Sequence, residues 1–97
     1  MNEKQILNLL MCIVNEAKEK LISNDWGDLS KADAAPLVDT YNKLRKIVIS
    51  KGWLDNDVIE NNLVLEINLD DENWGNGGAI IYETLWAATV LSQFIYK

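Results

Sequence analysis

Histidine is absent from this chain, and cysteine and proline occur once each, as Cys12 and Pro36. Without histidine, the chain lacks the usual general base, the Ser–His and Cys–His nucleophile systems and the commonest metal ligand. A single cysteine excludes an internal disulfide and a cysteine-based zinc site, and a lone thiol is typical of a reducing compartment. We therefore expect a cytoplasmic protein that is not an enzyme and carries neither a cofactor nor a metal.

Loops that hold phosphate or calcium are missing as well. The glycine-rich run at 75–78 lacks the Lys-Ser/Thr pair that follows a phosphate-binding loop. The acidic run from Asp71 opens like a calcium loop, but its glycine comes one position early and Tyr82 stands where glutamate is needed. The N-terminus has no cationic leader, and the most apolar stretch, 79–96, is short for a membrane span and contains Glu83. We expect no membrane partner.

The length of 97 residues predicts a single domain, 1–97, and the 48% hydrophobic content is ordinary for a globular protein. Apolar residues recur at steps of three and four over 2–23, 34–51 and 79–96, which predicts three amphipathic helices. The last of them is apolar around most of its circumference, so we expect the other helices to cover it. The predicted fold class is all-α, a small compact bundle of three to four helices.

Several residues mark where these helices begin and end. Asn2 is suited to cap the first helix and Asp33 the second. Pro36 is then tolerated because it falls in the first turn, where amides have no partner inside the helix. Gly52 is a natural residue for the left-handed end of the second helix. The Asn-, Asp- and Gly-rich runs at 24–33 and 70–78 are predicted to be loops.

Residues 55–69 are consistent with two structures. Asp55 is placed to cap a fourth helix that runs through this stretch. However, apolar and other residues alternate in steps of two over 63–69, which is the period of a β-strand and makes α+β the alternative class. No strong partner strand is visible, so a strand here would pair with a weak local segment or with another molecule.

Lysine and arginine are absent from residues 52–96, which hold eight acidic residues, whereas residues 1–51 hold seven acids and eight bases. The whole chain has a net charge of −6. This charge disfavours direct contact with nucleic acid or an anionic membrane and favours a basic protein partner. The alternative is that the acids are spread over several faces and only keep the domain soluble.

Tryptophan is unusually frequent, with four residues in the chain. Trp26, Trp53 and Trp74 stand in loop-like stretches flanked by acids, whereas Trp86 lies inside the last predicted helix. An exposed indole beside carboxylates is typical of a protein interface, where the ring is buried and the acids pair with Arg or Lys. The alternative is that each indole folds back over an end of the bundle.

In these features the chain resembles bacterial immunity proteins, in the style of those of contact-dependent growth inhibition systems. The likeness rests on Trp26, Trp53, Trp74 and the acids of 55–83. It implies a protein that binds and inhibits a cognate toxin, such as a nuclease with a basic face. The predicted partner-binding residues are Asp55, Asp57, Glu60, Asp70, Asp71, Glu72, Trp74, Trp26, Asp25 and Asp28. The alternative function is a small structural or regulatory subunit that forms a homodimer through 63–69.

Overall fold

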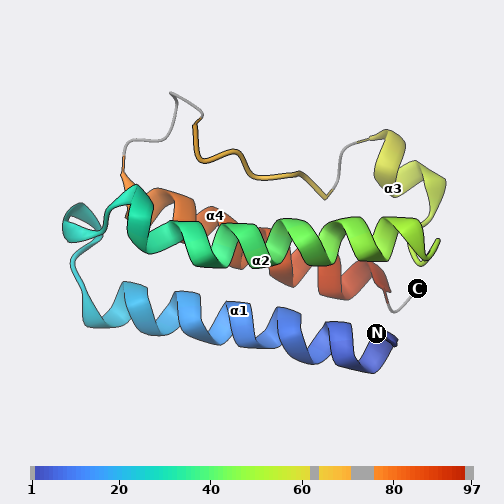
Figure 1. Cartoon of the computed structure of the whole chain (residues 1–97), viewed down its shortest axis with the longest axis horizontal. Helices are drawn as coiled ribbons and strands as arrows, with labels where there is room; N and C mark the ends of the chain where they lie inside the picture. The colour runs from blue at the N-terminus through green and yellow to red at the C-terminus, as the bar shows by residue number, and fades with distance from the viewer. Residues whose placement is uncertain (1, 62–63, 71–75, 96–97) are drawn as a thin grey trace.

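The computed structural model describes residues 2–61, 64–70 and 76–95. They form α1 (Glu3–Ser23), the short 3₁₀ helix η1 (Trp26–Asp28), α2 (Lys31–Ser50), α3 (Asn56–Glu60) and α4 (Gly77–Ile95) (Figure 1). These described ranges contain no β-strand. The predicted all-α bundle is therefore confirmed.

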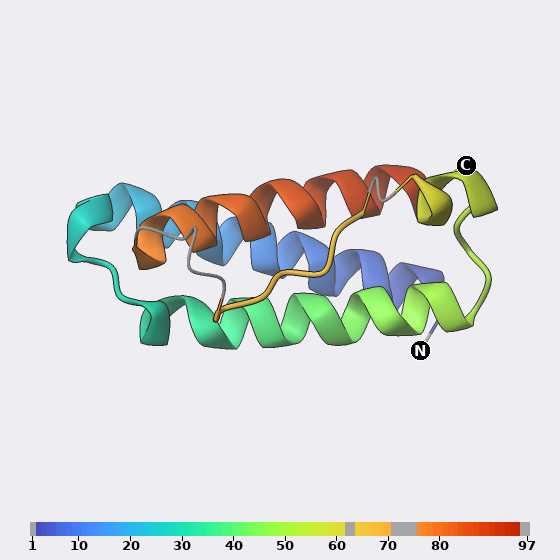
Figure 2. The ribbon, with the colours of Figure 1, turned by 90° about the horizontal axis from the view of Figure 1, so that it is seen from above.

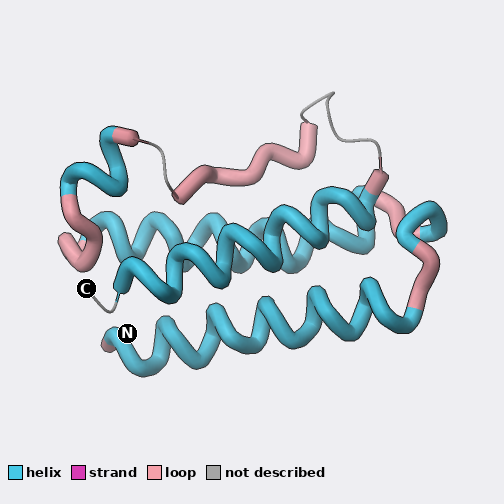
Figure 3. The backbone as a smooth tube through the Cα atoms, turned by 180° about the vertical axis from the view of Figure 1, so that it is seen from behind, coloured by secondary structure: helices cyan, strands magenta, loops and turns pink. Residues whose placement is uncertain are grey.

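The three long helices lie side by side, and α4 packs against both α1 and α2 (Figures 1 and 2). α1 runs in one direction along the bundle, and α2 and α4 run in the opposite direction. Because α2 and α4 are parallel, the chain must return along the bundle between them. It does so through α3 and the residues that follow, of which 64–70 are described (Figure 3).

The two N-terminal caps of α1 and α2 are reciprocal side-chain and backbone pairs. The Asn2 side chain accepts from the Gln5 amide at 2.9 Å, so Asn2 caps α1 as predicted. The prediction for α2 was wrong by three residues, because Ser30 is the cap. Asp33 accepts from the Ser30 amide at 2.8 Å, and these hydrogen bonds lower the pKa of the Asp33 carboxyl. Pro36 therefore lies inside α2, beyond the first turn.

Two glycines bring η1 into contact with the start of α4, which begins at Gly77 rather than at 79. The Gly77 amide donates to the Leu29 carbonyl at 3.0 Å. A Cβ atom on Gly77 would lie 1.8 Å from the Ser30 carbonyl oxygen, and one on Gly78 would lie 2.8 Å from that of Trp26. Only residues without a side chain permit this approach, so the pair has a packing role and is not simply a flexible turn.

α1 and α2 both pack against α4, as expected of the most apolar helix, but one stripe of α4 stays exposed. Ile80, Ile81 and Leu91 of α4 are fully buried in the core. Tyr82 and Trp86, on another side of the helix, are exposed. α4 is also the one described helix whose length and composition would let it cross a membrane, with 39% of its most apolar window buried.

Residues 64–70 are neither the helix nor the strand that the sequence allowed. The helix predicted for 55–69 is limited to Asn56–Glu60, and 64–68 follow without regular secondary structure. Val64 and Ile67 are buried while Leu65 and Glu66 are exposed, so burial recurs after three residues and not after two. The residues whose alternation suggested a strand therefore form an irregular connection instead.

Side chains of α2 take the place of a partner strand for this connection. The Tyr41 hydroxyl donates to the Leu65 carbonyl at 2.7 Å, and Arg45 Nε donates to the Val64 carbonyl at 3.0 Å. Asn42 donates to the Ile67 carbonyl at 2.8 Å and accepts from the Ile67 amide at 3.1 Å. Buried backbone groups need partners, and here one turn of a helix supplies them. We call residues 64–70 the return segment.

Candidate protein-binding surface

Three aromatic side chains form a continuous exposed row on η1 and α4. The ring centroids of Trp26 and Tyr82 are 5.2 Å apart, and those of Tyr82 and Trp86 are 6.2 Å apart with the rings near perpendicular. Their exposed fractions are 43% for Trp26, 38% for Tyr82 and 50% for Trp86. These separations are typical of favourable aromatic contacts. We call Trp26, Tyr82 and Trp86 the aromatic row.

The row is held in place by local structure at both of its elements. Tyr82 and Trp86 are four residues apart on α4, so they project from the same side of the helix. Trp26 opens η1, whose cap Asp25 accepts from the Gly27 amide at 3.0 Å. The close contact of Gly78 with the Trp26 backbone fixes η1 against α4. The row is therefore preorganised and does not depend on a mobile loop.

An apolar hollow of about 210 Å³ lies between α4 and the return segment. Apolar side chains from both elements line it, and Leu65 is 58% exposed at its edge. Glu66 and Glu83 are the charged residues among its lining. The complete lining is Leu65, Glu66, Ile67, Glu83, Trp86, Ala87 and Val90. We call this hollow the apolar groove, and Trp86 joins it to the aromatic row.

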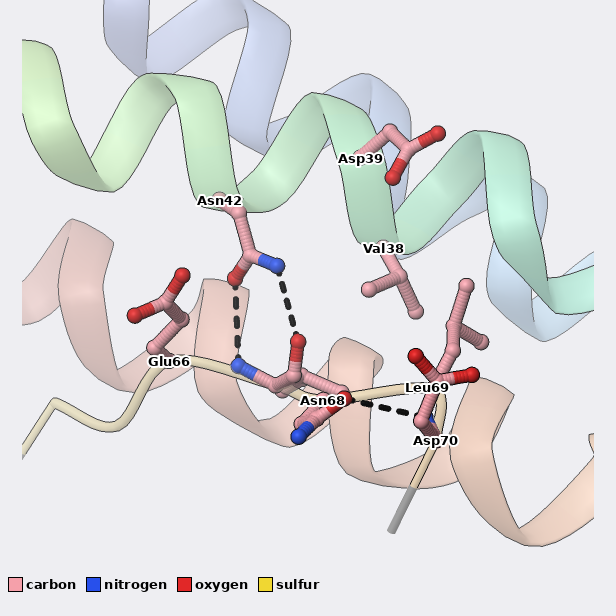
Figure 4. A pocket seen from close by; sticks show the side chains of 8 residues that line it. Val38, Asp39, Asn42, Glu66, Asn68, Leu69 and Asp70 are labelled. Atoms are coloured by element: carbon pink, nitrogen blue, oxygen red, sulfur yellow. Dashed lines mark hydrogen bonds between the residues drawn. The ribbon is translucent and has the colours of Figure 1, made fainter.

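A second hollow, of about 520 Å³, lies on the other side of the return segment, against α2 (Figure 4). Carboxylates of Asp39, Glu66 and Asp70 line it together with Asn42 and Asn68. Within the described residues no group of three or more acidic or cysteine side chains is arranged to hold a metal ion. The hollow therefore presents negative charge to solvent. We call it the acidic hollow.

The structure divides the predicted partner-binding residues among three places. Asp25 and Asp28 are exposed beside Trp26 in the aromatic row, and Asp70 lines the acidic hollow. Asp55, Asp57 and Glu60 are exposed around α3, at the end of the bundle opposite η1 (Figure 1). Asp71, Glu72 and Trp74 lie outside the described residues.

The sequence prediction missed the residues at the centre of this surface. Tyr82 and Trp86 were not predicted to bind a partner. Leu65 and Glu66 were implicated only through the alternative homodimer contact at 63–69, and Glu83 only as one of the acids of 55–83. One available signal was Glu83, the only charged residue of α4. A lone charge marks the solvent side of an otherwise apolar helix, and Tyr82 and Trp86 lie one residue before it and three after it. Trp53, by contrast, is half-buried and packs against the core, as the alternative reading of the indoles allowed.

Tyr41, which holds the return segment, should make the free energy of unfolding depend on pH in the alkaline range. Tyr41 is fully buried, and this burial raises the pKa of its phenol to about 12. The folded state then holds the proton more tightly than the unfolded state, so the stabilisation is complete below pH ~10 and is lost as pH rises toward ~12. We expect a loss on the order of 2 kcal/mol in the free energy of unfolding. Urea titrations across this pH range measure it, and a Tyr41→Phe variant that shows the same slope would contradict the assignment.

No protein-family model, characterised protein or solved structure matches this chain. Its function must therefore be inferred from the surface itself.

Proposed function

We propose that this protein binds a basic protein partner and neutralises it, and that the partner is a bacterial toxin to which this chain is the immunity protein. The observation that supports the proposal most is the exposed aromatic row with carboxylates beside it. Two of its indoles are each more than two-fifths exposed. Large aromatic side chains dominate the energy of protein interfaces, and leaving them in water is unfavourable without a partner.

The charge of the surface favours a basic partner over a neutral one. Glu66 and Glu83 line the apolar groove, and Asp25 and Asp28 flank Trp26. Residues 52–96 contribute no lysine or arginine to offset them. A negative field steers a positive protein toward the surface and speeds association, and it repels nucleic acid. Inhibition would follow because the bound chain covers the basic face on which the toxin holds its substrate.

Self-association is the other function that the sequence allowed, and charge disfavours it at this surface. A two-fold contact would place the same patch of each copy against its mate, and would bring the acidic residues of the two patches, Glu66 and Glu83, into one interface. The backbone of Leu65 and Ile67, expected to pair with a second copy, already bonds to α2. We expect a monomer in sedimentation experiments, and a stable dimer would favour the alternative.

The proposal is tested by a growth experiment with the gene product encoded beside this chain. In a host that lacks both, that product should arrest growth and the chain should restore it. Tyr82→Ala combined with Trp86→Ala should weaken binding by about 30-fold or more, because two central aromatics are lost together, and should abolish rescue. Calorimetry or surface plasmon resonance gives the affinity, and circular dichroism verifies the fold.

Two matched controls distinguish this surface from the rest of the bundle. Met11 is an exposed large hydrophobic on α1, so Met11→Ala should keep full rescue. Glu83→Lys should slow association and flatten its salt dependence, whereas Glu16→Lys on α1 should do so much less. An unrelieved arrest of growth in the presence of the wild-type chain would refute the immunity function.

A further inference from the structure

We infer that the return segment is a ridge straddled by an amphipathic, arginine-bearing stretch of the partner, with an aliphatic side chain in the apolar groove and a basic one in the acidic hollow. This inference rests on the proposed function, because it specifies the partner at the same surface. Its basis is a juxtaposition: one seven-residue segment separates an apolar depression from an acidic one, and Glu66 lines both.

The apolar groove has the size and lining for one side chain of a protein. Its volume of about 210 Å³ is below the range of roughly 300–1,000 Å³ typical of small-molecule sites. Trp86 and Leu65, both at least half exposed, form its rim. An aliphatic group that entered between them would remove their apolar surface from water, which is the main source of affinity in such contacts.

The acidic hollow specifies the second anchor. Asp39 on α2 and Glu66 and Asp70 on the return segment supply three carboxylates around it (Figure 4). All three of these residues are exposed, so their carboxylates are hydrated in the free protein. A guanidinium offers five donors in a planar fork that matches the two oxygens of a carboxylate and leaves donors for a second acid, which favours arginine over lysine here.

The backbone of the return segment is held in one conformation by side chains of α2. Tyr41, Asn42 and Arg45 hold the backbone of Val64, Leu65 and Ile67 through four hydrogen bonds on the side of α2. A surface that is already ordered loses little conformational entropy on binding. The distance that must separate the aliphatic and the basic side chain of the partner is therefore set by the free structure of this protein and not by a rearrangement on binding.

The test uses an acetylated, amidated hexapeptide of alternating leucine and arginine and the isotope-labelled full chain. We expect NMR chemical-shift changes centred on Leu65, Glu66, Trp86 and Val90 at peptide concentrations of about 1 mM, as befits two isolated anchors. A leucine–glutamate peptide should fail because of charge, and a serine–arginine peptide should bind about tenfold more weakly for want of the aliphatic group. Leu65→Ser should weaken binding of the leucine–arginine peptide about tenfold, and Ile22→Ser on α1 should leave it unchanged.

Several outcomes would overturn the inference. They are an absence of shifts at these residues, equal binding of the glutamate peptide, or shifts produced instead by phosphatidylcholine–phosphatidylglycerol vesicles, which would mark the face as membrane-binding. The growth assay separates the two proposals. If the wild-type chain restores growth but does not bind the peptide, only the inference about the return segment is refuted. If the chain binds the peptide but does not restore growth, only the immunity function is refuted.

Discussion

Gly77→Ala is expected to lower the free energy of unfolding by about 3–5 kcal/mol, the largest effect of adding a methyl group at any of the glycines that the structure describes. Its Cβ would meet the Ser30 carbonyl oxygen at 1.8 Å and the Ser30 carbonyl carbon at 2.2 Å. Both are backbone atoms, so the stretch from η1 to the α2 cap would have to move, and the hydrogen bond from the Gly77 amide to the Leu29 carbonyl would break. Overpacking and a lost buried hydrogen bond are each worth roughly 1–3 kcal/mol.

The same movement should disrupt the aromatic row, because it would break the contact between the rings of Trp26 and Tyr82. Urea denaturation followed by circular dichroism measures the stability, and tryptophan fluorescence reports the surroundings of the indoles. Gly27→Ala is the matched control, since a Cβ atom there would meet only Asp25 Oδ1, at 3.7 Å, and the variant should stay within about 0.5 kcal/mol of the wild type. Gly52, with a φ of 72° and open space around it, should lie between them at about 1–2 kcal/mol. An equal loss in all three variants would show that close packing at Gly77 is not the cause.

Asn42→Ala should lower the free energy of unfolding by about 2–4 kcal/mol. One amide side chain satisfies both the N–H and the carbonyl of Ile67, as a neighbouring strand would. Alanine would leave both groups without a protein partner in a partly buried place, and each such loss is worth roughly 1–3 kcal/mol. We also expect weaker binding at the apolar groove, because the return segment forms one of its walls. Urea denaturation and the peptide titration measure the two effects separately.

Asn42→Asp is the informative companion to that variant. An ionised carboxylate would still accept from the Ile67 amide, but it would face the Ile67 carbonyl with negative charge and lies in the hollow lined by Asp39 and Glu66. Protonation restores the missing donor, so folding raises the pKa of the introduced carboxyl, and its stabilising effect is present at acid pH and lost as pH rises. Stability of Asn42→Asp relative to Asn42→Ala should therefore increase from neutral to mildly acidic pH. A constant difference between the two would contradict the donor role of Asn42.

Local sequence was enough to predict the three long helices, because each carries its own apolar period and the first its own cap. Leu37, Tyr41, Leu44 and Val48 recur at helical spacing and are all buried. The acid-rich second half was likewise visible without coordinates, and so was the exposure of Trp26 as one of two alternatives. The start of α2 was misplaced because Ser30 and Asp33 are both good caps, and only their mutual hydrogen bonds show which one stands outside the helix.

Long-range packing specified the rest, and above all the surface that we propose to bind a partner. Periodicity shows which residues of α4 share a side, and the lone charge of Glu83 indicates the solvent side. Only the packing of α1 and α2 in the bundle shows that Tyr82 and Trp86 stay exposed there. The alternation over 63–69 allowed a strand as the alternative to a helix. A strand needs a partner edge, however, and this bundle offers the side chains of α2 instead. The parallel course of α2 and α4 requires a connection that travels back along the bundle, and extended residues cover about 3.3 Å each against 1.5 Å in a helix.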